Sequence, residues 1–173
     1  MSNPAPKSVR VTRHYNGGVP FTVRDFRPSD FETIWHIDQT CFPPGISYSR
    51  AELRFYMQRR NAFTLIAARN ENSGADGAIL GFIVAEAEPR ARGHIITIDV
   101  VAAARRSGTG SLLLRAAEDR LSSLKCEIVK LETSVDNVTA LSFYKRHGYS
   151  VVRTAPRYYS NGMDALVLEK KVG

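Results

Sequence analysis

The sequence predicts one α/β domain in which helices pack against a mixed β-sheet. With 43% hydrophobic and 24% charged residues over 173 positions, the chain has the composition of a globular domain rather than a disordered chain. In its second half, strand-like and helix-like segments alternate, which is typical of crossover connections. In its first half, two strand-like segments follow each other across a short polar turn, as in a hairpin. Together these connections predict a sheet with mixed strand directions.

Two capping boxes predict the helices of the first half. Ser29 and Glu32 stand three residues apart before an apolar stripe of helical spacing, which predicts a helix that ends near Cys41. Ser49 and Glu52 repeat the pattern and predict a second helix of about ten residues.

The strands are predicted from apolar runs with alternating or β-branched residues, and residues 94–101 are expected to form the central one. Seven strands are predicted, over residues 21–26, 63–68, 78–86, 94–101, 127–132, 149–153 and 165–168. Two further helices are predicted over 108–123 and 137–147, with Gly148 ending the second, which brings the helices to four.

Residues 1–20 contain few clustered apolar side chains, so we expect a flexible tail with a short ordered piece near 9–11, followed by a single domain over 21–173. Neither a membrane-spanning stretch nor a signal peptide is evident, so no membrane partner is expected. Cys41 and Cys126 are too few for a disulfide scaffold, which favours the cytoplasm. These cysteines and four scattered histidines predict no metal site.

The chain is basic, since 24 Lys and Arg against 17 Asp and Glu give a net charge of +7. Such a surplus favours a polyanionic partner, which could be nucleic acid, an acidic protein or a phosphorylated cofactor. Basic and acidic residues are interleaved along the sequence, which argues against a nucleic-acid surface because phosphate binding needs a clustered patch.

A glycine-rich turn, residues 105–110 (RRSGTG), joins the central strand to the next helix. Unpaired N–H groups and the helix dipole make such a helix start an anion site, and glycine lets a phosphate approach the backbone. A P-loop would require Gly-Lys-Ser/Thr, and a dinucleotide fingerprint would require glycine where Leu113 stands. The turn therefore predicts phosphate binding or, alternatively, only a tight strand-to-helix connection.

Two motifs resemble those of GNAT-superfamily N-acetyltransferases. Arg105-x-x-Gly108-x-Gly110, placed after Val100, is similar to the superfamily's acetyl-CoA signature. Residues 137–149 resemble its Asn-x-x-Ala-x-x-x-Tyr-x-x-x-Gly-Phe/Tyr block. The resemblance covers nearly the whole chain after residue 20. It implies the GNAT fold, a mixed, mostly antiparallel seven-stranded sheet splayed between its central strands and flanked by about four helices.

Within the superfamily the chain is similar to RimI-type protein N-terminal acetyltransferases. The spacing of Glu132, Asn137 and Tyr144 matches that type, and residues 157–165 and 36–43 resemble its C-terminal hairpin and first helix. This narrower resemblance implies transfer of acetyl from acetyl-CoA to a protein N-terminus, with a ribosomal protein as one known target of the type. No metal cofactor is implied.

The resemblance also implies roles for individual residues. Acetyl transfer to an α-amino group, whose pKa is near ~8, requires loss of a proton, and Glu132 is implied as the base, acting directly or through water. Tyr144 is implied to protonate the departing thiolate, and the Val100 N–H to bind the oxyanion. The acetyl-CoA site is implied to comprise Ile98, Asp99, Val100, Arg105, Arg106, Ser107, Gly108, Thr109, Gly110, Ser111, Asn137 and Tyr144.

Tyr158 and Tyr159 are implied to form a wall of the substrate site, and Asp99, which stands where the family often has a small or apolar residue, is expected to contact substrate. Three other functions remain open. They are acetylation of a small amine such as a polyamine, an antibiotic or an amino acid, binding of nucleic acid or the ribosome, and non-catalytic sensing of acyl-CoA. The preferred N-terminal residue and the oligomeric state are also left open.

Overall fold

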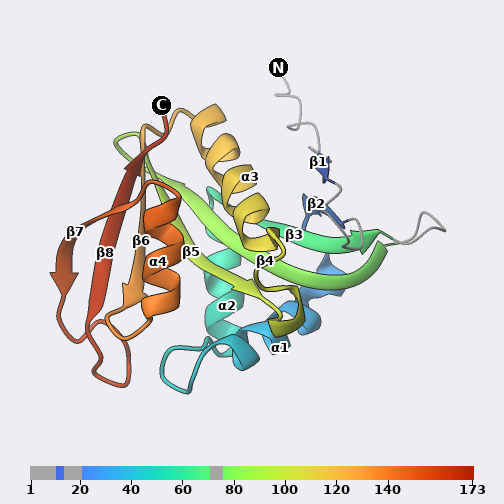
Figure 1. Cartoon of the computed structure of the whole chain (residues 1–173), viewed down its shortest axis with the longest axis horizontal. Helices are drawn as coiled ribbons and strands as arrows, with labels where there is room; N and C mark the ends of the chain where they lie inside the picture. The colour runs from blue at the N-terminus through green and yellow to red at the C-terminus, as the bar shows by residue number, and fades with distance from the viewer. Residues whose placement is uncertain (1–10, 14–20, 71–75) are drawn as a thin grey trace.

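A computed structural model of the chain describes residues 11–13, 21–70 and 76–173. In these residues one twisted sheet runs through the molecule, with helices on both faces (Figure 1). The strands are β1 (Val11–Arg13), β2 (Phe21–Asp25), β3 (Ala62–Asn70), β4 (Asp76–Glu88), β5 (Arg92–Val100), β6 (Ile128–Ser134), β7 (Ser150–Ala155) and β8 (Ala165–Lys171). The α-helices are α1 (Phe31–Cys41), α2 (Arg50–Met57), α3 (Thr109–Ser123) and α4 (Val138–Arg146).

This arrangement confirms the predicted α/β sheet and its four helices. The seven expected strands are present, and β1 adds an eighth to the described sheet by pairing with β2. The rest of the expected tail, residues 1–10 and 14–20, lies outside the described residues, as does most of the expected turn between β3 and β4. None of the helices in the described ranges is long and apolar enough to cross a membrane.

The sheet opens between its two central strands. All neighbouring strands are antiparallel except β5 and β6, which run parallel and pair only from Arg92–Ile95 to Ile128–Leu131. Beyond Ile95 the two strands diverge, and the β4–β5 ladder shifts register at the same level, between Val84 and Ala85. The carboxyl-terminal half of β5 is therefore paired on one edge only, which leaves space for a ligand between β5 and β6.

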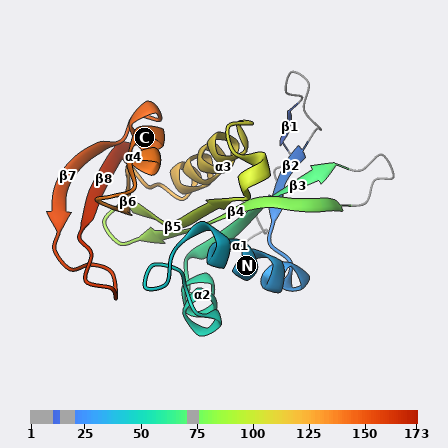
Figure 2. The same ribbon diagram turned by 60° about the horizontal axis from the view of Figure 1, so that its bottom comes forward.

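Two apolar cores cover the two faces of the sheet. The core on the α3 and α4 side contains Leu113, Leu121 and Tyr144, and the core on the α1 and α2 side contains Ile34 and Leu53. Figure 2 shows α3 on one side of the sheet and α1 with α2 on the other. The cores hold β5 in place at one edge of the opening, because α3 and α1 pack against β5 from its two faces.

One helix start differs from the sequence prediction. The box at Ser49 and Glu52 is present, with each residue's side chain accepting the other's N–H at 3.2 and 2.8 Å.

The box expected at Ser29 is wrong, because Pro28–Asp30 forms a 3-10 turn that precedes α1. The Asp30 carboxylate closes this turn by accepting the Arg27 N–H at 2.8 Å. A buried guanidinium–carboxylate pair explains the change, since Arg24 holds Asp30 at 2.7 and 2.9 Å.

Candidate active site

The opening between β5 and β6 exposes backbone hydrogen-bonding groups of Val100. The Val101 N–H donates to the Leu80 carbonyl of β4 at 2.9 Å. In an antiparallel pair, consecutive residues of a strand point their backbone groups to opposite edges, so the N–H and C=O of Val100 point away from β4. That edge faces β6 where the two strands no longer pair. The Val100 N–H is therefore placed to donate to a carbonyl oxygen held in the opening.

The glycine-rich turn presents a row of backbone N–H groups at the start of α3. The first helical bond of α3 runs from the Leu112 N–H to the Gly108 carbonyl at 2.9 Å, so the amides of residues 109–111 precede the helical ladder. Gly108 precedes the helix with φ +87°, a conformation that side chains disfavour. The arrangement can bind a phosphate anion at a helix N-terminus.

The side chains of the turn differ in burial and in the groups that they contact. Arg105 is exposed, with its Nε donating to the Val100 carbonyl at 3.1 Å and its Nη2 3.6 Å from Cys41 Sγ. Thr109 is fully buried, and its hydroxyl lies 2.8 Å from that of Ser107. Arg106 is exposed, with φ +62°. The Thr109 hydroxyl is therefore engaged within the turn, and the backbone amides of residues 109–111 are the groups placed to bind an anion.

Ser111 contacts a histidine that the sequence did not indicate as part of the site. His147 places Nδ1 2.8 Å from the Phe143 carbonyl and Nε2 2.9 Å from the Ser111 hydroxyl. A carbonyl only accepts, so Nδ1 carries hydrogen, and in the neutral ring Nε2 accepts from Ser111. This bridge ties the first turn of α3 to the end of α4.

Glu132 on β6 and His94 on β5 form a close pair across the central strands. Glu132 Oε2 lies 2.6 Å from His94 Nε2, and both side chains are largely buried. Burial raises the pKa of Glu132, but the hydrogen bond and charge of His94, with smaller contributions from Lys130 and Tyr158, outweigh it and leave the pKa lowered. The carboxylate is therefore ionised at neutral pH and accepts the His94 Nε2–H.

Tyr144 lies on α4 and is buried, with 6% of its surface exposed. Burial, together with the charges of Asp99 and Tyr159, raises its pKa above the ordinary tyrosine value. The phenol therefore keeps its proton at neutral pH and can act as an acid. Its hydroxyl makes no hydrogen bond with any residue that the structure describes.

Asn137 caps α4, because its Oδ1 accepts the Ala140 N–H at 3.0 Å. Its Nδ2 has no acceptor among the described residues and can donate to a ligand. Ile98 packs against the same core as Tyr144, on the face of β5 that meets α3.

Tyr158 and Tyr159 lie in the loop between β7 and β8, with ring centroids 5.0 Å apart. Tyr158 hydrogen-bonds Glu132, and burial with that carboxylate's charge raises its pKa. Burial and the same charge raise the pKa of Tyr159 to about 12. The loop also reaches the α1–α2 connection, where the Ser160 hydroxyl donates to the Gly45 carbonyl at 2.9 Å. The two tyrosines therefore lie beside the Glu132–His94 pair.

The expected direct contact between Asp99 and substrate does not agree with its position. Asp99 is 1% exposed, and its Oδ1 accepts the Thr97 hydroxyl at 2.9 Å. Its pKa is raised well above the ordinary value by burial and by the nearby charge of Asp38 on α1. Side chains alternate along a strand, so Asp99 points toward α1 while Ile98 and Val100 face α3.

Asp38 is itself fully buried, and the effect of its ionisation on stability can be tested. Burial raises its pKa to about 6 from 3.8, although the Tyr48 N–H and Gln39 donate to it. Because the folded state binds this proton more tightly, the resulting stability is fully present below about pH 4 and is lost as pH rises through 6. We expect Asp38→Asn, which cannot ionise, to exceed the wild type in unfolding free energy by roughly 2–3 kcal/mol at pH 8.

Urea unfolding at pH 4 and pH 8 measures this effect. The two proteins should differ little at pH 4, where Asp38 is mostly protonated in the folded state. An equal difference at both values would show that ionisation of Asp38 does not cause it.

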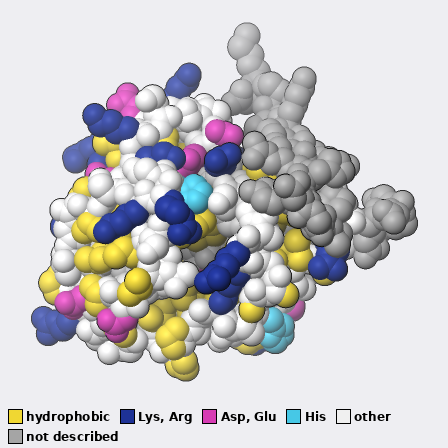
Figure 3. All heavy atoms as spheres, viewed as in Figure 1, with side chains coloured by type: hydrophobic (Ala, Val, Ile, Leu, Met, Phe, Trp, Pro, Cys, Tyr) yellow, Lys and Arg dark blue, Asp and Glu magenta, His cyan; other side chains and the backbone are white. Residues whose placement is uncertain are grey.

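Lys and Arg side chains are spread over the face that carries α3 and α4, with acidic side chains among them (Figure 3). They do not gather into one continuous patch in this view. The distribution agrees with the interleaving in the sequence and gives little support to a nucleic-acid surface on this face.

Comparisons with known proteins agree with this geometry. The model of a family described as "Acetyltransferase (GNAT) family" matches residues 31–149. An uncharacterized N-acetyltransferase of Methanocaldococcus jannaschii is 30% identical over 150 residues, covering 86% of this chain and 90% of that protein. N-alpha-acetyltransferase 30 of Saccharomyces cerevisiae is 32% identical over 125 residues, covering 70% of each. A chain of the NatC complex crystallised with Gag peptide and CoA superposes with a TM-score of 0.74 at 25% identity, covering 87% of this chain and 98% of that one.

Proposed function

Because this chain belongs to the GNAT acetyltransferase family, we propose that it acetylates the N-terminal α-amino group of a protein or peptide. As a GNAT N-acetyltransferase it takes the acetyl group from acetyl-CoA. Support for a protein N-terminus comes from relatives named N-alpha-acetyltransferase and from the superposed chain of a complex that holds a peptide and CoA. The finer proposal, a RimI-type preference for a ribosomal protein, depends on the sequence resemblance alone.

The Glu132–His94 pair beside the opening of the sheet is the observation that carries this proposal. A protein α-ammonium group has a pKa near ~8 and must lose a proton before it attacks. Glu132 is ionised, largely buried and next to the tyrosines of the β7–β8 loop, so we assign it as the acceptor of that proton, directly or through water. His94 acts with Glu132 by donating Nε2–H to it.

The remaining steps use backbone and phenol donors. The α3 amides and the free amide of Asn137 hold CoA, and the Val100 N–H binds the oxygen that becomes negative when the amine attacks the thioester carbon. The carbon–sulfur bond then breaks, and the acetyl group stays on the nitrogen. Tyr144 gives its proton to the CoA thiolate. Its raised pKa keeps this proton on the phenol until the thiolate forms.

Acetylation of a small polycation is less well supported by the charges near Glu132. Glu86 and Glu88 lie close to His94, but Arg59 pairs with Glu86 and Lys130 with Glu88, each at 3.0 Å. Both Oε2 atoms are thus occupied, which leaves only the two Oε1 atoms beside His94 for a further cation, fewer than an extended polyamine would need. The free thiols of Cys41 and Cys126 support our proposal of a cytoplasmic enzyme.

A peptide array assayed with acetyl-CoA tests the function. We expect acetylation of peptides with free N-termini, none of N-terminally blocked peptides, and less on spermidine. Tyr144→Phe should lower kcat by about 100-fold or more, since it removes the acid but keeps the ring. Tyr56→Phe, which removes a half-buried phenol on α2, is the matched control. Faster transfer to spermidine or to internal lysines than to any N-terminus would contradict the proposal.

A further inference from the structure

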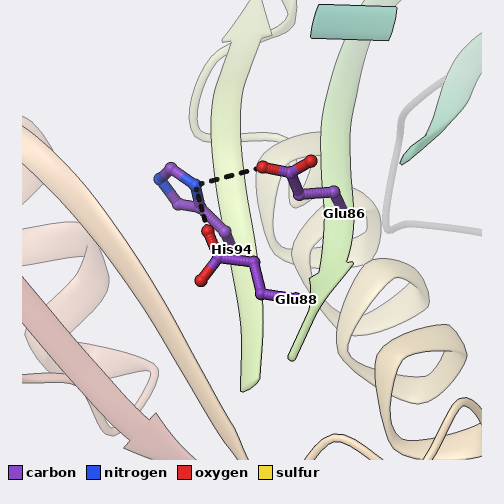
Figure 4. A group of neighbouring side chains, drawn as sticks. All are labelled: Glu86, Glu88 and His94. Atoms are coloured by element: carbon purple, nitrogen blue, oxygen red, sulfur yellow. Dashed lines mark ion pairs between the residues drawn. The ribbon is translucent and has the colours of Figure 1, made fainter. Parts of the chain in front are cut away.

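We propose that His94, Glu86 and Glu88 form a binding site for a divalent transition-metal ion of the Zn²⁺ class, and that the bound ion inhibits acetyl transfer. Nothing in the proposed reaction requires this ion. Figure 4 shows one ring nitrogen of His94 facing a carboxylate oxygen of each glutamate. One ligand atom from each of the three residues lies within 4.8 Å of the other two.

The two separations between His94 and the glutamates are close to those around a tetrahedral ion. His94 Nδ1 lies 3.4 Å from Glu88 Oε1 and 3.7 Å from Glu86 Oε1. Zinc binds nitrogen and carboxylate oxygen at about 2.0–2.2 Å, so neighbouring ligand atoms around it stand about 3.3–3.6 Å apart. A proton shared between the imidazole and a carboxylate would instead draw the two atoms to about 2.7–2.9 Å.

Each of the three side chains is oriented by a further residue that contacts its other polar atom. Glu86 Oε2 pairs with Arg59, and Glu88 Oε2 pairs with Lys130, so that both carboxylates turn their Oε1 atoms toward His94. His94 Nε2 is fixed on Glu132. Such outer partners orient the ligands of natural metal sites, and a carboxylate behind a ligating histidine is a common arrangement.

One of the proposed ligand atoms, Glu86 Oε1, lacks a hydrogen-bond donor. Glu86 is 4% exposed, and its Oε1 is buried without a hydrogen-bond partner. The His94 ring, which donates Nε2–H to Glu132, presents the lone pair of Nδ1 to this oxygen in its neutral form. Three electron-pair donors thus meet at a point where no described group donates, and a cation satisfies all three. Three protein ligands and an open fourth position are typical of zinc sites that also bind water.

Binding at Nδ1 would act on catalysis through the other ring nitrogen. A metal ion polarises the ring, strengthens Nε2–H donation to Glu132 and makes that carboxylate a weaker proton acceptor. The anion-binding turn follows the far end of β5, after Val100, so acetyl-CoA binding should be unaffected. The inhibition rests on the proposed function, whereas the metal site itself does not.

Isothermal titration calorimetry of untagged protein with ZnCl₂ tests the site. We expect one ion per chain for the wild type and at least about tenfold weaker binding for Glu88→Gln, which removes one donor charge. Glu127→Gln is the matched control, because Glu127 is exposed and outside the cluster, and it should bind as the wild type does. MgCl₂ should not compete, since Mg²⁺ prefers oxygen ligands in an octahedral site.

Co²⁺ provides a second readout, because its absorption distinguishes nitrogen and oxygen ligands from thiolate. A tetrahedral spectrum without a thiolate charge-transfer band, lost in Glu88→Gln, supports the site and excludes Cys41 and Cys126 as ligands. Equal Zn²⁺ affinity in the wild type and Glu88→Gln, or no binding at micromolar Zn²⁺, overturns the proposal.

Activity separates this inference from the proposed function. Zn²⁺ should lower kcat of the wild type, and EDTA should restore it. Without metal, Glu88→Gln should be close to the wild-type rate, and added Zn²⁺ should lower its rate less than that of the wild type. Zn²⁺ binding that leaves the acetylation rate unchanged would overturn the inhibition. Site-specific Zn²⁺ binding by a protein that acetylates no peptide would support the site and count only against the proposed function.

Discussion

Replacing Glu132 by Gln is expected to lower kcat for peptide acetylation by about 10²–10⁴-fold, the range that a positioned proton acceptor contributes. The amide keeps the size of the side chain and can still accept the His94 Nε2–H across the 2.6 Å contact, so the sheet should be undisturbed. Affinity for acetyl-CoA should change by less than about threefold, because the α3 amides that we propose bind it lie elsewhere. Steady-state kinetics in EDTA, with calorimetry of CoA binding, measure both quantities.

A double-mutant cycle with His94→Gln tests whether the two residues act as a unit. If they do, the double variant should be little slower than either single variant, since groups that act together lose their effect together. Glu127→Gln, an exposed carboxylate on the chain just before β6, is the control for loss of charge. Full activity of Glu132→Gln would mean that bulk water accepts the proton and that the resemblance-based role of Glu132 is wrong.

Most of the fold could be predicted from the sequence because local signals and tertiary packing agree. The Ser49–Glu52 box and the stop of α1 at Cys41 are local features, and both are present in the structure. The α3 and α4 starts follow from the motifs around Gly108 and Asn137. These elements need no knowledge of distant residues, which is why their prediction succeeds.

The errors arise where a distant partner decides the structure. Ser29 has the right spacing for a cap, but Asp30 is drawn into a buried pair with Arg24 and closes the turn instead. Asp99 is charged and was expected at the substrate, but the strand's alternation turns it into the interior against α1. A sequence pattern does not show which face of a central strand a charged residue meets.

The Glu132–His94 pair is a contact between distant residues that the sequence did not predict. His94 begins the predicted central strand, yet nothing near it in sequence indicates a function. It meets Glu132 because β5 and β6 pair in parallel, with His94 opposite Lys130 and Glu132 two residues further along β6. A signal was available, since a histidine at the start of a strand beside a strand with a candidate acid could have been examined as its partner.

Substitution of Gly108 by Asp is expected to weaken acetyl-CoA binding by about 100-fold or more. The side chain would bring a negative charge to amides 109–111 and accept the N–H groups that a diphosphate needs. Losing two charge-assisted hydrogen bonds of about 1.5–3 kcal/mol each accounts for at least this factor. The helix itself should survive, because aspartate is a favourable residue at a helix N-terminus.

The control must place a side chain at an equally unfavourable backbone conformation, since Gly108 has φ +87°. Gly162→Asp provides it, because Gly162 has φ +81° and an added Cβ there meets nothing within 4 Å. Both variants should lose comparable unfolding free energy, of order 1–2 kcal/mol, and only Gly108→Asp should lose CoA affinity. Calorimetry with CoA and urea unfolding of both variants separate strain from ligand loss. Wild-type affinity in Gly108→Asp would move the diphosphate site away from α3 and leave the turn as a tight strand-to-helix connection.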